Sequence, residues 1–132
     1  SAHITLAFTG IGASPDGGTT FLLPRVVGPK LASELFLTNR RLDAGEALGV
    51  GLVSRVLGDE ELMPETVAVA RRLATGPRHA YATSKALLRT SLLRGYEAQL
   101  EEERRGVTRA VSGGEFREGV AAFLEKRAPQ FQ

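Results

Sequence analysis

The sequence predicts an α/β fold in which most residues are helical. Short β-branched segments and most turn-forming glycines lie before residue 58. After Asp59, apolar residues recur at helical spacing, with breaks at residues 76–77, 95 and 113–114. We therefore expect two parts, a region of short strands and helices at residues 1–58 and a helical region at residues 59–132.

The sequence predicts a buried strand at the start of the first region. Residues 3–8 are apolar and β-branched, and the glycines and proline of residues 10–18 then forbid regular structure and permit tight turns. A short helix is expected over residues 17–23, with Asp16 as its N-cap and Pro24 near its end.

Two more helices and a second strand complete the first region. Residues 29–38 begin with proline and predict a helix, and Asp43 is placed to cap a short helix through Leu48. Residues 52–56 alternate between apolar and polar like a strand. Because two strands alone make no stable sheet in water, we expect both strands to belong to a larger sheet that these residues do not contain.

Four helices are expected after Asp59, each identified by apolar residues on one face. The run of glutamates and arginines over residues 101–105 suits ion pairs between neighbouring turns, such as Glu101 with Arg105, and predicts a solvated helix face.

The composition excludes several classes of function. The net charge is only +2, from 17 basic and 15 acidic side chains that are interleaved, so nucleic acid is not an expected partner. The absence of cysteine excludes disulfides and thiolate sites, and His3 and His79 lack any metal-ligand spacing, so no metal is expected. No apolar run is long enough to span a membrane. We expect a cytoplasmic protein, and because a strand-like segment follows Ser1 at once without an initiator methionine, we expect its beginning to be missing.

Four segments carry a resemblance to a known family. Residues 11–28 form a glycine-rich loop and a helix that ends in Leu-Pro-Arg-Val-Val-Gly, and residues 32–38, 43–53 and 118–127 follow in the same order as in the crotonase superfamily, the enoyl-CoA hydratase/isomerase group. The resemblance covers essentially the whole chain. It implies the C-terminal part of a crotonase-like core, built from ββα turns, followed by a helical region that assembles trimers or hexamers.

The resemblance also implies chemistry on acyl-coenzyme A thioesters, in which an enolate is stabilised and a positioned acid or base directs the proton. Coenzyme A would be part of the substrate, and no tightly bound cofactor is expected. The half of the fold that supplies the oxyanion-hole N–H groups in this family is not among these residues, so the chain alone is expected to be inactive.

Asp16 is the candidate catalytic residue. Its spacing before two glycines is that of a helix cap, but the Ser-Pro-Asp-Gly-Gly loop resembles that of phenylacetyl-CoA-type enoyl-CoA isomerases, in which the aspartate moves a proton between carbons. The second glutamate of the hydratases would fall near Phe8, where no carboxylate is present. A double-bond isomerase is therefore favoured over a hydratase.

Two alternatives stay open. Residues 37–40 and 51–56 resemble 4-chlorobenzoyl-CoA dehalogenases, in which an aspartate at the position of Asp16 attacks an aromatic carbon, although the tryptophan of those enzymes would match Phe8 here. The chain could instead be a non-catalytic member whose helices serve only assembly.

Five further residues are candidates for binding. Phe8, Leu22 and Leu23 are candidates to line the acyl pocket, although apolar residues beside a strand or helix are more often core. Phe123 and Lys126 match positions at which the C-terminal helix of a neighbouring subunit helps to bind coenzyme A in the family, and a core phenylalanine and a solvated lysine are equally good interpretations.

Overall fold

A computed structural model of the chain describes residues 2–131 and divides into two compact units, Ser1–Leu62 and Met63–Gln132. The division falls within one helix, close to the start of the predicted helical region. Each unit is described on its own.

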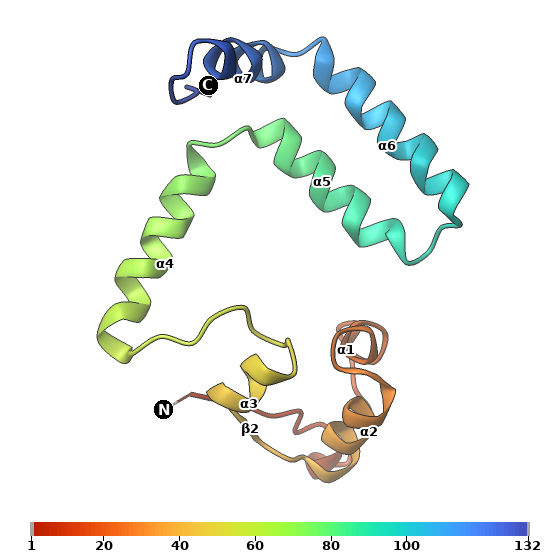
Figure 1. Cartoon of the computed structure of the whole chain (residues 1–132). Helices are drawn as coiled ribbons and strands as arrows, with labels where there is room; N and C mark the ends of the chain where they lie inside the picture. The colour runs from red at the N-terminus through yellow and green to blue at the C-terminus, as the bar shows by residue number, and fades with distance from the viewer. Residues whose placement is uncertain (1, 132) are drawn as a thin grey trace. The chain divides into compact units, whose positions relative to one another are not determined.

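Unit 1 contains one small antiparallel ladder. Strand β1 (His3–Ile4) pairs with strand β2 (Leu42–Asp43), with Ile4 opposite Leu42 (Figure 1). The predicted strand over residues 3–8 is thus only partly right, because the chain leaves the ladder after Ile4 and reaches a 3₁₀ turn, η1 (Thr9–Ile11).

The predicted strand over residues 52–56 is wrong. These residues form bends and irregular backbone, although Leu52 and Val53 are partly buried. A strand is stabilised by the hydrogen bonds of a neighbour, and in the described part of the chain no third strand pairs with this segment. Alternating apolar residues alone were therefore an insufficient signal.

Helix α1 (Thr19–Val27) begins later and ends later than the predicted helix over residues 17–23. Gly17 and Gly18 have φ angles of +61° and +79°, so neither continues a right-handed helix, and Gly18 is the N-cap. The expectation that Asp16 caps this helix is wrong, since no side chain caps it. Pro24 lies within the helix instead of near its end, and its missing N–H removes one hydrogen bond of the ladder.

Helices α2 (Pro29–Thr38) and α3 (Ala44–Gly49) lie where the sequence predicts them. The N-cap of α3 is a capping box, in which the Asp43 carboxylate accepts the N–H of Glu46 at 2.8 Å and the Glu46 carboxylate accepts the N–H of Asp43 at 3.1 Å. Local side-chain chemistry is enough to start this helix.

The core of unit 1 lies between β2 and the helices. It is small and consists of five buried residues: Leu23, Ala32, Leu35, Leu42 and Ala47. Larger side chains such as Ile4, Leu6 and Phe36 pack against it but stay partly exposed.

The predicted helical region contains the four expected helices, which are α4 (Asp59–Ala74), α5 (Arg78–Ser91), α6 (Tyr96–Val111) and α7 (Gly114–Leu124). In unit 2, α6 packs against both α5 and α7. Gly106 is buried where α6 approaches α5, and a Cβ atom there would lie 3.1 Å from Thr83. The ion pairs of Glu101 with Arg104 and Arg105 lie on the exposed face of α6, as expected.

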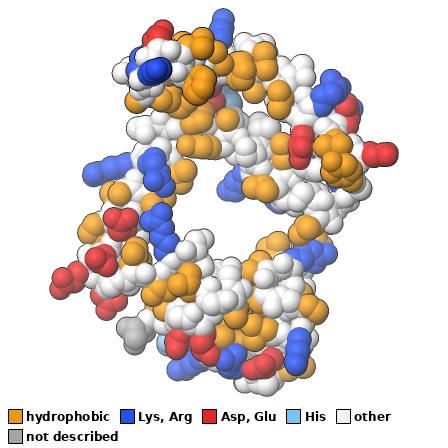
Figure 2. All heavy atoms as spheres, in the orientation of Figure 1, with side chains coloured by type: hydrophobic (Ala, Val, Ile, Leu, Met, Phe, Trp, Pro, Cys, Tyr) orange, Lys and Arg blue, Asp and Glu red, His pale blue; other side chains and the backbone are white. Residues whose placement is uncertain are grey.

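Unit 2 leaves much of its apolar surface exposed. Among the described residues of unit 2, Ala122 is the one buried apolar side chain. Large apolar side chains of every helix from α4 to α7 are exposed to solvent. Figure 2 shows such side chains scattered over the visible face of the molecule. None of the described helices combines the length and apolarity that a membrane span requires.

Candidate functional site

Asp16 is an exposed residue in the irregular segment that precedes α1. Its backbone carbonyl accepts hydrogen bonds from Thr19, at 3.1 Å from the amide nitrogen and 2.8 Å from Oγ1. Its carboxylate has no hydrogen-bond or ion-pair partner among the described residues. The backbone at Asp16 is thus restrained, while the acidic group is left available to a ligand.

The glycines around Asp16 explain this arrangement. Gly17 and Gly18 both have positive φ angles, and a Cβ atom at either position would meet no atom within 4 Å. Backbone conformation, not lack of space, requires glycine here. The open space also means that a ligand can approach the backbone of the turn.

An apolar cavity of about 230 Å³ lies beside the first turns of α1. Leu22 and Leu23 line it, together with Ile4, Leu6, Thr19 and Leu42, whereas Phe8 does not. The structure therefore brings together two of the three predicted acyl-pocket residues. Leu23 is also a core residue at 8% exposure, whereas Leu22 is 58% exposed.

Thr19 links the cavity to the loop of Asp16. Its side chain lines the cavity, and its hydroxyl donates to the Asp16 carbonyl oxygen. No sequence signal marked this residue as part of a site, because a threonine at the start of a helix is an ordinary turn residue.

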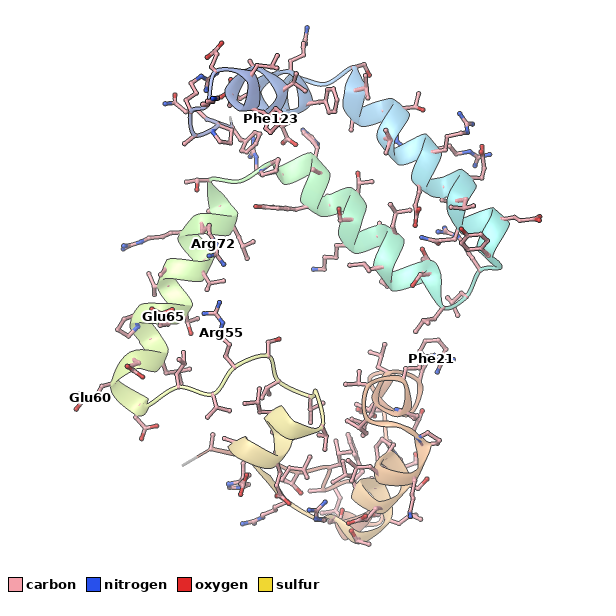
Figure 3. All side chains as sticks on the ribbon, in the orientation of Figure 1. Phe21, Arg55, Glu60, Glu65, Arg72 and Phe123 are labelled. Carbon is pink, nitrogen blue, oxygen red and sulfur yellow. The ribbon has the colours of Figure 1, made fainter. Side chains whose placement is uncertain are left out.

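Phe123 and Lys126 lie at the end of α7 in unit 2. Phe123 is 82% exposed and projects from the helix (Figure 3). Lys126 has a φ angle of +55°, and the N–H groups of Lys126 and Arg127 donate to the carbonyls of Phe123 and Ala122, which is the Schellman pattern of a helix end. A residue other than glycine is uncommon at that position.

The segment after α7 is tied back to the helix by Glu118. Its carboxylate accepts two hydrogen bonds from the Arg127 guanidinium, at 2.6 and 3.0 Å, and one from the Gln130 N–H at 2.7 Å. These bonds lower the pKa of Glu118 to about 2, with the Arg127 hydrogen bond as the main cause. Lys126 is thereby held in an ordered turn.

A groove of about 910 Å³ runs between α5, α6 and α7 in unit 2. Its lining is mostly apolar and includes Leu87, Val107, Val120 and Phe123. We call it the α5–α7 groove. His79 is also among the lining residues and is exposed.

The two sets of predicted site residues belong to different units. Asp16, Leu22 and Leu23 lie in unit 1, and Phe123 and Lys126 lie in unit 2. Among the residues that the structure describes, no three histidine or acidic side chains form a group suited to a metal ion.

Comparison with known proteins gives the class of this chain. The family model for enoyl-CoA hydratase/isomerase matches residues 1–132. The chain is 38% identical over 131 residues to 1,2-epoxyphenylacetyl-CoA isomerase of Escherichia coli, covering 99% of this chain and 50% of that protein. It is 34% identical over 120 residues to 4-chlorobenzoyl coenzyme A dehalogenase-1 of an Arthrobacter species, covering 91% of this chain and 44% of that protein.

Solved structures agree with this assignment. The enoyl-CoA hydratase from Polaromonas sp. JS666 superposes with a TM-score of 0.92 at 32% identity, over 99% of this chain and 51% of that one. The chain belongs to the enoyl-CoA hydratase/isomerase family and has part of the crotonase fold, which confirms the expectation from the sequence. It spans about half the length of the curated relatives it matches.

Proposed function

We propose that this chain is part of a double-bond isomerase that acts on acyl-coenzyme A thioesters, with Asp16 as the acid/base group. The observation that carries the proposal is the Asp16 carboxylate, which is exposed and unpartnered in the described part of the chain and lies within the loop that resembles that of the isomerases. The identity to 1,2-epoxyphenylacetyl-CoA isomerase supports it.

The proposed reaction moves one proton. The Asp16 carboxylate removes a proton from a carbon that is acidified by the conjugated thioester, which leaves a dienolate. The same group, now a carboxylic acid, returns the proton to a different carbon of the dienolate, so the double bond shifts and Asp16 ends as a carboxylate. No other reactant is consumed.

The acyl group would lie near the apolar cavity of unit 1. Leu22 is the best candidate to contact it, because its side chain is exposed and lines the cavity, and Thr19 connects the same cavity to the loop of Asp16. In the assembled protein, Phe123 and Lys126 of a neighbouring subunit would contact the coenzyme A moiety. The aromatic face of Phe123 suits a purine, and the Lys126 ammonium suits a phosphate.

Activity would require more than these residues. The relatives are about twice as long, and a polypeptide equivalent to their other half would cover the apolar face of unit 1 that Leu22 and Val26 now expose. That segment would supply the oxyanion-hole donors. Assembly as a trimer or hexamer through the exposed apolar faces of unit 2 is part of the same proposal.

A dehalogenase is the second candidate, supported by the identity to 4-chlorobenzoyl coenzyme A dehalogenase-1. In that reaction an Asp16 oxygen attacks the aromatic carbon, chloride leaves, and water hydrolyses the resulting aryl ester. A non-catalytic assembly role is the third candidate, since the exposed apolar helices alone would suffice for it.

The test compares Asp16→Asn with Asp59→Asn in the assembled enzyme, with intact mass checked first. Asp59 is an exposed aspartate in the first turn of α4 and is a matched control. We expect the assembled enzyme to isomerise an enoyl-CoA. Asp16→Asn should lower the rate of this reaction by at least about 100-fold, and Asp59→Asn should leave the rate unchanged.

The other outcomes separate the candidates. A covalent aryl adduct at Asp16, trapped from a halobenzoyl-CoA and detected by mass spectrometry, would replace the isomerase by the dehalogenase. A correctly assembled protein that turns over neither substrate class would favour the non-catalytic role.

A further inference from the structure

Helix α5 is capped by a residue from another helix. Its own N-cap is Pro77, which provides no side-chain hydrogen bond. The Glu115 carboxylate, from the first turn of α7, accepts the N–H of His79 at 3.0 Å and the N–H of Ala80 at 3.3 Å. Two backbone donors that a helix leaves unsatisfied at its start are thus satisfied by a group 36 residues away.

The charge of Glu115 suits this position. The positive end of a helix dipole favours an anion, and a carboxylate that accepts backbone N–H groups is stabilised in its charged form. The pKa of Glu115 is accordingly lowered, first by the His79 backbone hydrogen bond and also by the nearby charges of His79 and Arg78. The contact is an ion–dipole bond between α5 and α7.

Glu115 also forms one end of the α5–α7 groove. It lines the groove together with Phe116, Val120 and Phe123 of its own helix and with Pro77 and Ala80 at the start of α5. The open volume between these helices means that side-chain packing does not fill the space along the groove, so the bond at Glu115 restrains the angle between them.

The restraint acts at a distance on Phe123. Phe123 lies eight residues after Glu115, about 12 Å along the axis at the rise of an α-helix, so a rotation of about 10° at Glu115 would move Phe123 by about 2 Å. The far end of α7 is ordered by the bonds of Glu118 to Arg127 and Gln130. The helix and the turn that carries Lys126 therefore move as one body, which is held by the packing of α6 against α7 and, at the start of α5, by Glu115.

We propose that Glu115 is a positioning residue for coenzyme A recognition. It does not touch the ligand; it fixes α7 on the first turn of α5 and so holds Phe123 and Lys126 in place for the nucleotide end of coenzyme A. This inference rests on the proposed function, which assigns those two residues to coenzyme A.

The test uses Glu115→Gln in the assembled enzyme, with Glu97→Gln as the control. Glu97 likewise lies in the first turn of its helix, α6, but makes no hydrogen bond to another helix among the described residues. One measurement is the hydrogen exchange of the His79 and Ala80 amides by NMR, and the other is the affinity for coenzyme A by calorimetry.

We expect Glu115→Gln to speed exchange at both amides by about tenfold and to weaken coenzyme A binding by a similar factor, in line with the loss of a charged hydrogen-bond acceptor. Glu97→Gln should change neither. Phe123→Ala and Lys126→Ala should weaken binding without changing exchange at His79 and Ala80.

Three results would overturn the inference, and they identify which part fails. Unchanged exchange in Glu115→Gln would mean that the carboxylate does not hold α5. Faster exchange with unchanged affinity, while Phe123→Ala or Lys126→Ala still weakens binding, would reject the positioning role and leave the proposed function standing. Unchanged affinity in both Phe123→Ala and Lys126→Ala would reject the coenzyme A site itself.

Discussion

Leu42 is the residue on which the core of unit 1 most depends, and its truncation gives a sharp prediction. It lies in β2 opposite Ile4, is 1% exposed, and is the one large side chain of the described residues with less than 2% exposure. Replacing a buried leucine by alanine lowers the free energy of unfolding by about 3 kcal/mol, because apolar burial is lost and a cavity remains. Since the core contains only five buried residues, little else can compensate.

Leu22 provides the matched control because the chemical change is the same. With 58% of its surface already in solvent, it has less than half of its burial to lose, so Leu22→Ala should cost under about 1 kcal/mol. The measurement is native-state hydrogen exchange of the slowest amides of unit 1, which reports the stability of that unit separately from unit 2.

Equal losses in Leu42→Ala and Leu22→Ala would refute this reasoning, because burial would then not govern the stability of unit 1. The same pair also tests the proposed covering segment. If a polypeptide equivalent to the other half of the relatives packs over Leu22, the cost of Leu22→Ala in the assembled protein should rise towards that of Leu42→Ala.

Two predictions concern the end of α7. Lys126→Gly should have a free energy of unfolding about 1 kcal/mol higher than Lys126→Ala, because only glycine adopts the φ angle of +55° without strain. Urea denaturation measures this difference, and equal stability of the two variants would contradict the prediction. The pKa of Glu118 is lowered from 4.5 to about 2 in the folded chain, so its stabilising contribution is complete above about pH 4.5 and is lost as the pH falls towards 2. Glu118→Gln should therefore flatten the loss of stability over that range in acid denaturation, and an unchanged acid transition would show that the Arg127 pair does not stabilise the fold.

Helix positions were the most predictable part of the fold. Proline at the start of α2, the capping box of Asp43 and Glu46, and the breaks that precede α5, α6 and α7 are local signals, and the helices follow them. Hydrogen bonds in a helix join residues four apart, so a short stretch of sequence contains nearly all the information that places it.

The candidate site was predictable only in part. Asp16, Leu22 and Phe123 could be named from the resemblance of their segments to a family, but neither the unpartnered state of Asp16 nor the exposure of Leu22 and Phe123 follows from residue type. Glu115 could not be found, since nothing in its neighbourhood indicates a bond to the start of α5.

The sequence by itself determined the family and the order of the helices, and it made Asp16 the candidate for acid/base chemistry. Only the tertiary structure decided that Ile4 pairs with Leu42 and that Glu115 caps α5. The physical reason is the separation of the partners. Strand pairing and caps between helices depend on residues far apart in the chain, and only the packing of the folded units brings those groups within hydrogen-bond distance.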